Sequence, residues 1–273
     1  DIEERHLGLI PSPEDTASLN KNNALRDAVE NQVDLDRLLE IAHDTAPAKP
    51  ATSVREAAAR QPDVNIGIVE NAAFGFYYPD DLDAFAKAGA NLIRIDNLTD
   101  TALPQLDGLF IGGGFPETHM SALESNESFR RQLAQAIDNG LPVYAECGGL
   151  MYLARSLEWQ QEKHDMVGAI PADIVMESKP QGRGYVQLRE TADGLWPATS
   201  GKTIAAHEFH YSRFLNLPKD ARFAFQVLRG NGIDGEHDGY IRNNMLACYT
   251  HQRNTRNNDW VVRFVEFVRQ CNS

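Results

Sequence analysis

The apolar positions of the chain follow two periods, which alternate from about residue 64 onward. Continuous apolar runs, typical of buried strands, occur at Asn65–Val69, Asn91–Ile95, Gly108–Ile111 and 141–146. Between them, apolar residues recur at helical spacing after Pro79 and from Phe129 to Asn139. Strands that alternate with helices form parallel sheets with right-handed crossovers. The pattern therefore predicts an α/β fold with an open, mostly parallel sheet flanked by helices.

The pattern changes to mainly β after Leu157, which predicts an added antiparallel portion. A final amphipathic helix follows, with Trp260, Phe264 and Val268 on its apolar stripe. The expected strands are Asp173–Met176, Tyr185–Arg189, Ile204–His210, Arg222–Leu228, Gly239–Arg242 and Met245–Tyr249.

Residues 1–62 differ from the remainder. They contain a candidate strand at 5–10, a helix at 24–32 and a second helix that begins after Asp34 as its cap. A proline-rich linker follows at 45–52. One strand and two helices cannot close a core, so we expect residues 1–62 to be the tail of a preceding domain plus a linker. Residues 63–273 are then the main domain.

One stretch, from Leu141 to Leu157, carries the clearest chemical signal. The strand 141–146 is followed by Cys147-Gly-Gly149, and helical spacing resumes from Leu150 to Leu157. Two glycines permit a sharp turn between strand and helix. Such a turn places Cys147 at the helix N-terminus, where unpaired N–H groups favour a thiolate over a thiol. The stretch predicts a nucleophile elbow, although a lone cysteine is more often a buried core residue.

A nucleophilic cysteine needs a base, and His251 is the strongest candidate. It follows the strand Met245–Tyr249, and sites in parallel sheets gather at the carboxyl ends of strands. A surface histidine is the alternative. His207, Glu208 and His210 could instead bind a metal, but their spacing is not a zinc-helix pattern, and we expect a structural or substrate-facing role and no metal.

Composition narrows the class of protein. The formal net charge of −13 argues against nonspecific nucleic-acid binding and against attraction to an anionic membrane. There is no apolar run long enough to span a membrane and no signal peptide at the first residues. Three scattered cysteines do not form a disulfide framework, so we expect a cytoplasmic protein with free thiols.

An apparent nucleotide-binding signature is incomplete. Residues 200–203 read Ser-Gly-Lys-Thr, like the end of a phosphate-binding loop, but the glycine required at position 196 is a tryptophan. We therefore expect no ATP site and no cofactor in this chain.

Several motifs together resemble the glutaminase half of the cobyrinate a,c-diamide synthase family. The match runs from about Val64 to His251, and the first segment resembles the close of that family's amidoligase domain. The sister cobyric acid synthases resemble the chain less. The motifs are Asn71-Ala-Ala-Phe-Gly-Phe-Tyr-Tyr-Pro79, Leu109-Phe-Ile-Gly-Gly-Gly-Phe-Pro-Glu117, Ala145-Glu-Cys-Gly-Gly-Leu-Met-Tyr-Leu153, His207-Glu-Phe-His-Tyr-Ser212 and Cys248-Tyr-Thr-His251.

This resemblance implies a class I glutamine amidotransferase with a flavodoxin-like sheet. By position, Cys147 matches the nucleophile and His251 the base. Gly113, Gly114 and Gly148 match the oxyanion-hole and substrate-binding positions. Many class I enzymes place a glutamate two residues after the histidine, but Arg253 stands there, which implies a Cys–His dyad. Accessory roles are open to Glu146, His207, Glu208 and His210.

The resemblance also implies partners. L-glutamine would be hydrolysed here, while ATP and Mg²⁺ would bind a preceding N-terminal amidoligase domain. A tetrapyrrole would lie at the interface of the two domains, and a homodimer stays open. Cobyrinate, amidated at its a and c carboxylates in cobalamin biosynthesis, is the leading acceptor. Hydrogenobyrinate and nickel-sirohydrochlorin are alternatives, as is a noncatalytic interaction module.

Overall fold

The computed structural model describes residues 18–45, 60–198 and 201–273, which belong to two compact units divided after Ala58. In the first unit, helices α1 (Ser18–Gln32) and α2 (Leu35–His43) are formed. The side chain of Asp34 caps α2 by accepting a hydrogen bond from the backbone nitrogen of Arg37 at 2.9 Å, as the sequence predicts. The candidate strand at 5–10 and nearly all of the linker lie outside the described residues.

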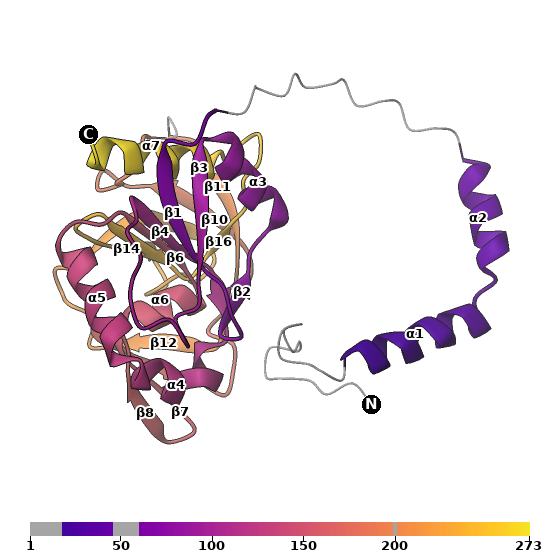
Figure 1. The fold of residues 1–273 in the computed structure, drawn as a ribbon, viewed down its shortest axis with the longest axis horizontal. Coiled ribbons are helices and arrows are strands. Elements are labelled where there is room, and N and C mark those ends of the chain that lie inside the picture. Colours follow the sequence, from indigo (N-terminus) through magenta and orange to yellow (C-terminus); the bar gives the residue numbers. More distant parts are fainter. Residues whose placement is uncertain (1–17, 46–59, 199–200) are drawn as a thin grey trace. The chain divides into compact units, whose positions relative to one another are not determined.

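The second unit contains the parallel sheet that the sequence predicts. Its strands run in the order β15-β6-β4-β1-β3, and every neighbouring pair is parallel (Figure 1). The carboxyl ends of these strands therefore meet along one edge of the sheet. The strands are β1 (Val64–Val69), β3 (Ala90–Ile95), β4 (Gly108–Ile111), β6 (Val143–Glu146) and β15 (Met245–Cys248).

Helices cover both faces of this sheet because alternate strand residues point to opposite sides. On one face, Phe110 and Tyr144 pack with helices α3 (Pro79–Lys87) and α7 (Trp260–Cys271). On the other face, Val143 packs with α5 (Glu127–Asp138) and α6 (Gly148–Leu153). The strands that lead to the site thus lie between two layers of buried apolar side chains.

Antiparallel strands extend the sheet beyond β15 in the order β14-β13-β10-β11-β16. Only residues 249 and 250 separate β15 from β16 along the chain, although four strands lie between them in the order of the sheet. The sheet therefore curls until β16 returns beside the strand that precedes it. The bounds are β10 (Gly182–Glu190), β11 (Ile204–His210), β13 (Arg222–Arg229), β14 (His237–Arg242) and β16 (His251–Gln252).

The predicted extension of the helix to Leu157 is wrong, because these residues belong to a second sheet. Helix α6 ends at Leu153, and Ala154–Trp159 forms strand β7, which pairs with β9 and β8. The apolar spacing of this stretch fits a helix and a strand alike, and the partner strands decide between them. The order of this sheet is β12-β9-β7-β8, with β8 (Glu162–Asp165), β9 (Ile170–Met176) and β12 (Ser212–Leu215).

Short elements complete the second unit. Strands β2 (Phe74–Phe76) and β5 (Gly113–Gly114) form a two-stranded ladder, followed by the 3₁₀ helix η2 (Pro116–His119) and helix α4 (Met120–Ser125). None of the helices in the part of the chain described here is both long and apolar enough to cross a membrane.

Candidate functional site

Cys147 occupies the sharp turn that the sequence predicts between β6 and α6. Its backbone has φ 47° and ψ −101°, a region that non-glycine residues rarely adopt. The turn is held from both sides: the Cys147 N–H donates to the Cys248 carbonyl at 2.7 Å, and its own carbonyl accepts from Met151 N at 3.0 Å. The side chain is only 6% exposed, and its sulfur lies 3.9 Å from the Phe209 carbonyl oxygen.

The glycine loop 112–114 packs directly onto this elbow. A Cβ on Gly148 would lie 2.8 Å from the Gly114 nitrogen, and a Cβ on Gly114 would lie 2.0 Å from the Ala73 carbonyl oxygen. The segment 71–78, which is rich in aromatic residues, holds these glycines in place, since β2 pairs with β5 and the Phe115 N–H donates to Ala73 O at 2.8 Å. Close backbone approach of this kind requires glycine at both positions.

His251 lies against the same glycines. A Cβ on Gly113 would be 2.6 Å from Cε1 of His251. The imidazole also interacts with the Cys147 side chain, and its Nδ1 lies 3.2 Å from Oε2 of Glu146. Burial alone would lower the pKa of His251, but its interactions with Cys147 and Glu146 outweigh burial and raise the pKa to about 10. The structure thus brings Cys147, His251 and the glycine backbone to one point.

Glu146 lies beneath this point and is 3% exposed. Its Oε1 accepts hydrogen bonds from the Tyr144 hydroxyl at 2.6 Å and from the Gln252 backbone nitrogen at 2.9 Å. The Gln252 side chain in turn donates to the Tyr144 hydroxyl at 3.1 Å. Arg253, at the position where many class I enzymes have a glutamate, instead binds Asp80 at 2.9 Å.

His207 lies beside His251 on the neighbouring strand. The two residues are register partners in the β11–β16 ladder, and their ring centroids are 6.3 Å apart. Burial, followed by the charge of His251, lowers the pKa of His207. The ring of the exposed Tyr185 lies 6.4 Å away on the other side. His207 therefore lies directly beside the base, where its positively charged form is disfavoured.

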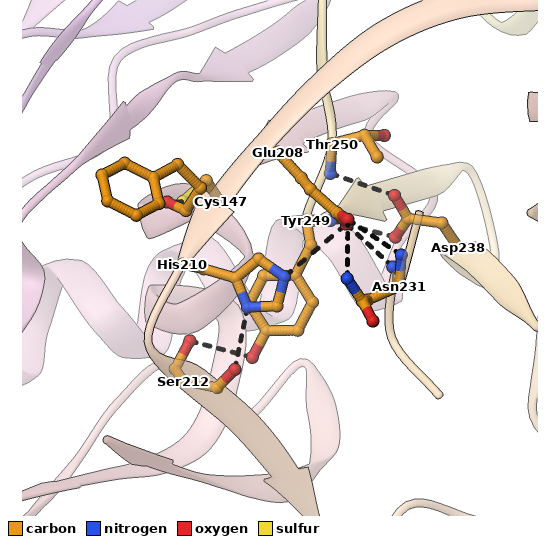
Figure 2. A network of polar contacts seen from close by, with 10 residues as sticks. Cys147, Glu208, His210, Ser212, Asn231, Asp238, Tyr249 and Thr250 are labelled. Carbon is orange, nitrogen blue, oxygen red and sulfur yellow. Dashed lines mark hydrogen bonds and ion pairs between the residues drawn. The ribbon is translucent and has the colours of Figure 1, made fainter. Parts of the chain in front are cut away.

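Glu208 and His210 form a separate buried network, drawn in Figure 2, which includes contacts with Asn231 and Tyr249. Glu208 accepts from the backbone nitrogens of Asn231 at 2.8 Å and Gly232 at 2.9 Å, and its Oε2 lies 3.8 Å from His210 Nε2. Burial opposes the charge of Glu208, but the nearby His210 ring and the hydrogen bonds from these N–H groups hold its pKa below the usual value.

This network fixes the connection that leads to His251. The His210 ring stacks on Tyr249 at 3.8 Å, and its Nδ1 is 2.9 Å from the Ser212 carbonyl oxygen (Figure 2). Asp238 accepts from the backbone nitrogens of Tyr249 and Thr250, both at 3.0 Å. The two residues before His251 are thus anchored at side chain and backbone.

The histidine-rich strand does not assemble metal ligands. His207 points toward β16, whereas Glu208 and His210 bind Asn231 and Ser212. Within residues 18–45, 60–198 and 201–273, no group of three or more His, Cys, Asp or Glu side chains is arranged to hold a metal ion. Trp196, at the position where a phosphate-binding loop needs glycine, is 7% exposed and stacks with Trp260.

Together these groups can perform acyl transfer. A cysteine activated by histidine attacks a carbonyl carbon, and backbone N–H groups stabilise the oxyanion that forms. The sequence analysis left an accessory role open to Glu146 but did not pair it with His251, although a usable signal existed. An acidic residue in a buried strand requires partners, and strand alternation places it on the same face as Tyr144.

Comparisons with known proteins agree with this geometry. Residues 65–258 match the family described as the CobB/CobQ-like glutamine amidotransferase domain. The chain is 38% identical over 277 residues to the cobyrinate a,c-diamide synthase of Magnetococcus marinus, with 100% of this chain and 59% of the relative covered. It is 41% identical over 264 residues to that of Archaeoglobus fulgidus, with 96% of this chain and 57% of the relative covered.

A solved structure described as a glutamine amidotransferase has the same fold. Its TM-score is 0.53 at 15% sequence identity, and the match covers 74% of this chain and 98% of that structure. The expected α/β fold and the resemblance noted from the sequence motifs are both confirmed, while this chain spans less than two thirds of the curated relatives. With the family match covering most of its length, the chain belongs to the CobB/CobQ-like glutamine amidotransferases.

Proposed function

We propose that this chain hydrolyses glutamine as the ammonia-producing part of an ATP-dependent carbon–nitrogen ligase. The observation that carries the proposal is the strained elbow at Cys147, which faces His251 and two glycine segments at one point. Neither a buried structural cysteine nor a surface histidine would require that backbone strain.

The reaction begins with attack by the Cys147 sulfur on the side-chain carboxamide carbon of glutamine. His251, whose raised pKa favours its protonated form, carries the proton of the Cys147–His251 pair and donates it to the leaving nitrogen, so that the C–N bond breaks and ammonia departs. A γ-glutamyl thioester remains on Cys147. Water then adds to the thioester with His251 as base, the C–S bond breaks, and glutamate and the free thiol are released. The raised pKa of His251 suits its role as the proton donor to ammonia.

The glycine segments supply the oxyanion hole. During both additions the carboxamide oxygen becomes negatively charged, and N–H donors fixed before the reaction stabilise it. The backbone of Gly148 packs against Gly114, and the backbone of Gly113 packs against His251, so all three glycines lie beside the reacting groups. These three residues are the proposed donors.

The ammonia is proposed to reach a carboxylate that ATP has activated in an N-terminal amidoligase domain. The names of the curated relatives support cobyrinate as acceptor, at its a and c carboxylates, in cobalamin biosynthesis. ATP and Mg²⁺ would bind that domain, the tetrapyrrole would lie at the interface, and the reaction would take place in the cytoplasm. Assays of the full-length protein with cobyrinate, hydrogenobyrinate and nickel-sirohydrochlorin would identify the acceptor by amide formation.

The glutaminase step is tested with a glutamine analogue that carries an electrophile. It should label Cys147 and neither the buried Cys248 nor the exposed Cys271. In the full-length protein, Cys147→Ala should abolish amidation from glutamine and preserve amidation from free ammonia. Labelling of another cysteine, or glutamine use by the alanine variant, would reject the assignment and favour a noncatalytic module.

A further inference from the structure

The strongest unexplained feature of the site is the buried side chain of Glu146. It ends strand β6, directly before Cys147, and is 3% exposed. Glu146 lies on the sheet face of Tyr144, two residues earlier, whose hydroxyl it binds. A carboxylate is costly to bury unless hydrogen bonds satisfy its oxygens. The partners of this carboxylate therefore indicate what keeps it there.

The two oxygens of Glu146 have different partners. Oε1 accepts two hydrogen bonds, from the Tyr144 hydroxyl at 2.6 Å and the Gln252 backbone nitrogen at 2.9 Å. These contacts fix the carboxylate on a rigid strand. Oε2 remains for His251 Nδ1, at 3.2 Å. The fixed oxygen thus holds the plane of the carboxylate while the other faces the imidazole.

The contact also determines the tautomer of His251. A carboxylate oxygen can only accept, so Nδ1 carries the hydrogen and Nε2 is left to exchange a proton with the sulfur. This is the state that a base needs when its partner is a thiol. The other titratable groups near the imidazole are Cys147 itself and His207, whose ring centroid is 6.3 Å away.

The residue at the usual orienting position has a different contact. Arg253 binds Asp80 through Nε at 3.0 Å and Nη2 at 2.9 Å and lies over the Tyr78 ring. It therefore points away from Nδ1. Glu146 reaches Nδ1 because β6 and β15 are adjacent parallel strands, with Cys248 opposite Glu146 in the register.

We propose that Glu146 is the positioning residue of His251, supplied from the strand that carries the nucleophile in place of a glutamate after the histidine. The site then works as a triad in which two members are neighbours in sequence. This inference rests on the proposed glutaminase function.

The test compares Glu146→Gln with wild type in the full-length protein, measuring glutamate release from glutamine. A glutamine side chain can present its amide oxygen or its N–H₂ to Nδ1, so the tautomer is no longer fixed. We expect kcat to fall by about 100-fold, the lower range for a general base, with KM nearly unchanged. Ammonia-dependent amidation should persist because it takes place in the preceding domain, and the fluorescence of the buried Trp196 and Trp260 shows whether this unit is folded.

A second readout separates positioning from mere structural support. In wild type the His251 imidazole should titrate near pH 10, and in Glu146→Gln its NMR titration should move toward the ordinary value of 6.5. Glu146→Asp keeps the charge on a shorter side chain, so it should retain more activity than Glu146→Gln and covers the case in which that variant does not fold. Asp81→Asn is the matched control, because Asp81 is a buried carboxylate, 2% exposed, that binds the Asn254 backbone instead.

The outcomes distinguish this inference from the function on which it rests. Cys147→Ala and His251→Ala are measured in parallel. If both lose glutaminase activity while Glu146→Gln keeps kcat and the His251 titration of wild type, the positioning role is refuted and the glutaminase stands. Equal losses in Asp81→Asn and Glu146→Gln, with no change in the titration, would also refute it. If Cys147→Ala still releases glutamate, the proposed function itself fails.

Discussion

The backbone strain at Cys147 leads to a stability prediction that is independent of activity. Replacing Cys147 by glycine or by alanine removes the thiol in both cases, so neither variant should hydrolyse glutamine. The two differ in backbone freedom. With φ 47° and ψ −101°, the elbow lies in a region that costs a residue with a Cβ about 1–3 kcal/mol.

The expected difference follows from two opposing contributions. Glycine removes the strain but loses more conformational freedom on folding than alanine, by roughly 0.5–1 kcal/mol. The net result is that Cys147→Gly should be more stable than Cys147→Ala by about 1 kcal/mol. For a unit of this size, that corresponds to a Tm higher by roughly 2–4 °C. At Ala145, on the regular strand β6 and fully buried, Ala145→Gly should destabilise by a similar amount.

Urea unfolding followed by tryptophan fluorescence measures these free energies, since Trp196 and Trp260 are buried in the same unit as the elbow. The sign is decisive. Glycine is expected to be less stable than alanine at the unstrained position 145. If Cys147→Gly is likewise no more stable than Cys147→Ala, the elbow carries no strain and the main structural argument for the nucleophile is lost.

Three further predictions test other parts of the site. Gly114→Ala should lower the free energy of unfolding by about 2 kcal/mol or more and abolish glutamate release, because its Cβ would lie 2.0 Å from Ala73 O. Gly75→Ala is the control and should be tolerated, since the nearest atom to its Cβ would be 3.8 Å away. Equal urea midpoints for the two variants would contradict this prediction. The pKa of His251 is raised to about 10 in the fold, so its contribution to stability is complete below the unfolded value of 6.5 and is lost as the pH rises through 10. Wild type should therefore lose stability relative to His251→Gln between these values, and parallel urea curves would exclude the effect. Calorimetry should detect no micromolar ATP binding to this chain, since Trp196 replaces the required glycine, and binding at that level would overturn the interpretation of residues 196–203.

The sequence predicted the parts of the fold that depend on local pattern. The parallel strands, the elbow and the Asp34 cap are each specified by a few neighbouring residues, and all are present. The end of helix α6 was wrong, because Ala154 and Leu157 fit both periods and the choice is made by pairing with β9. In the small sheet that contains β7, the strand at Asp173–Met176 was predicted, but its pairing with β7 was not, for the same reason.

The site shows the same limit. Cys147 is recognisable from its own neighbours, whereas the partner of His251 is not, because Glu146 lies 105 positions earlier in the sequence. Only the adjacency of β6 and β15 brings the two together. Spacing along the chain identifies a nucleophile and a base, but the group that orients the base depends on sheet order, which the sequence pattern leaves open.

The curl of the sheet has a consequence for the growing polypeptide. His251 is carried by β16, which is held to β11 by just two register pairs. During translation, the strand with Cys147 leaves the ribosome long before β16 is made. Under the proposed function, a nascent chain that ends before β16 has the nucleophile without its base and should not hydrolyse glutamine.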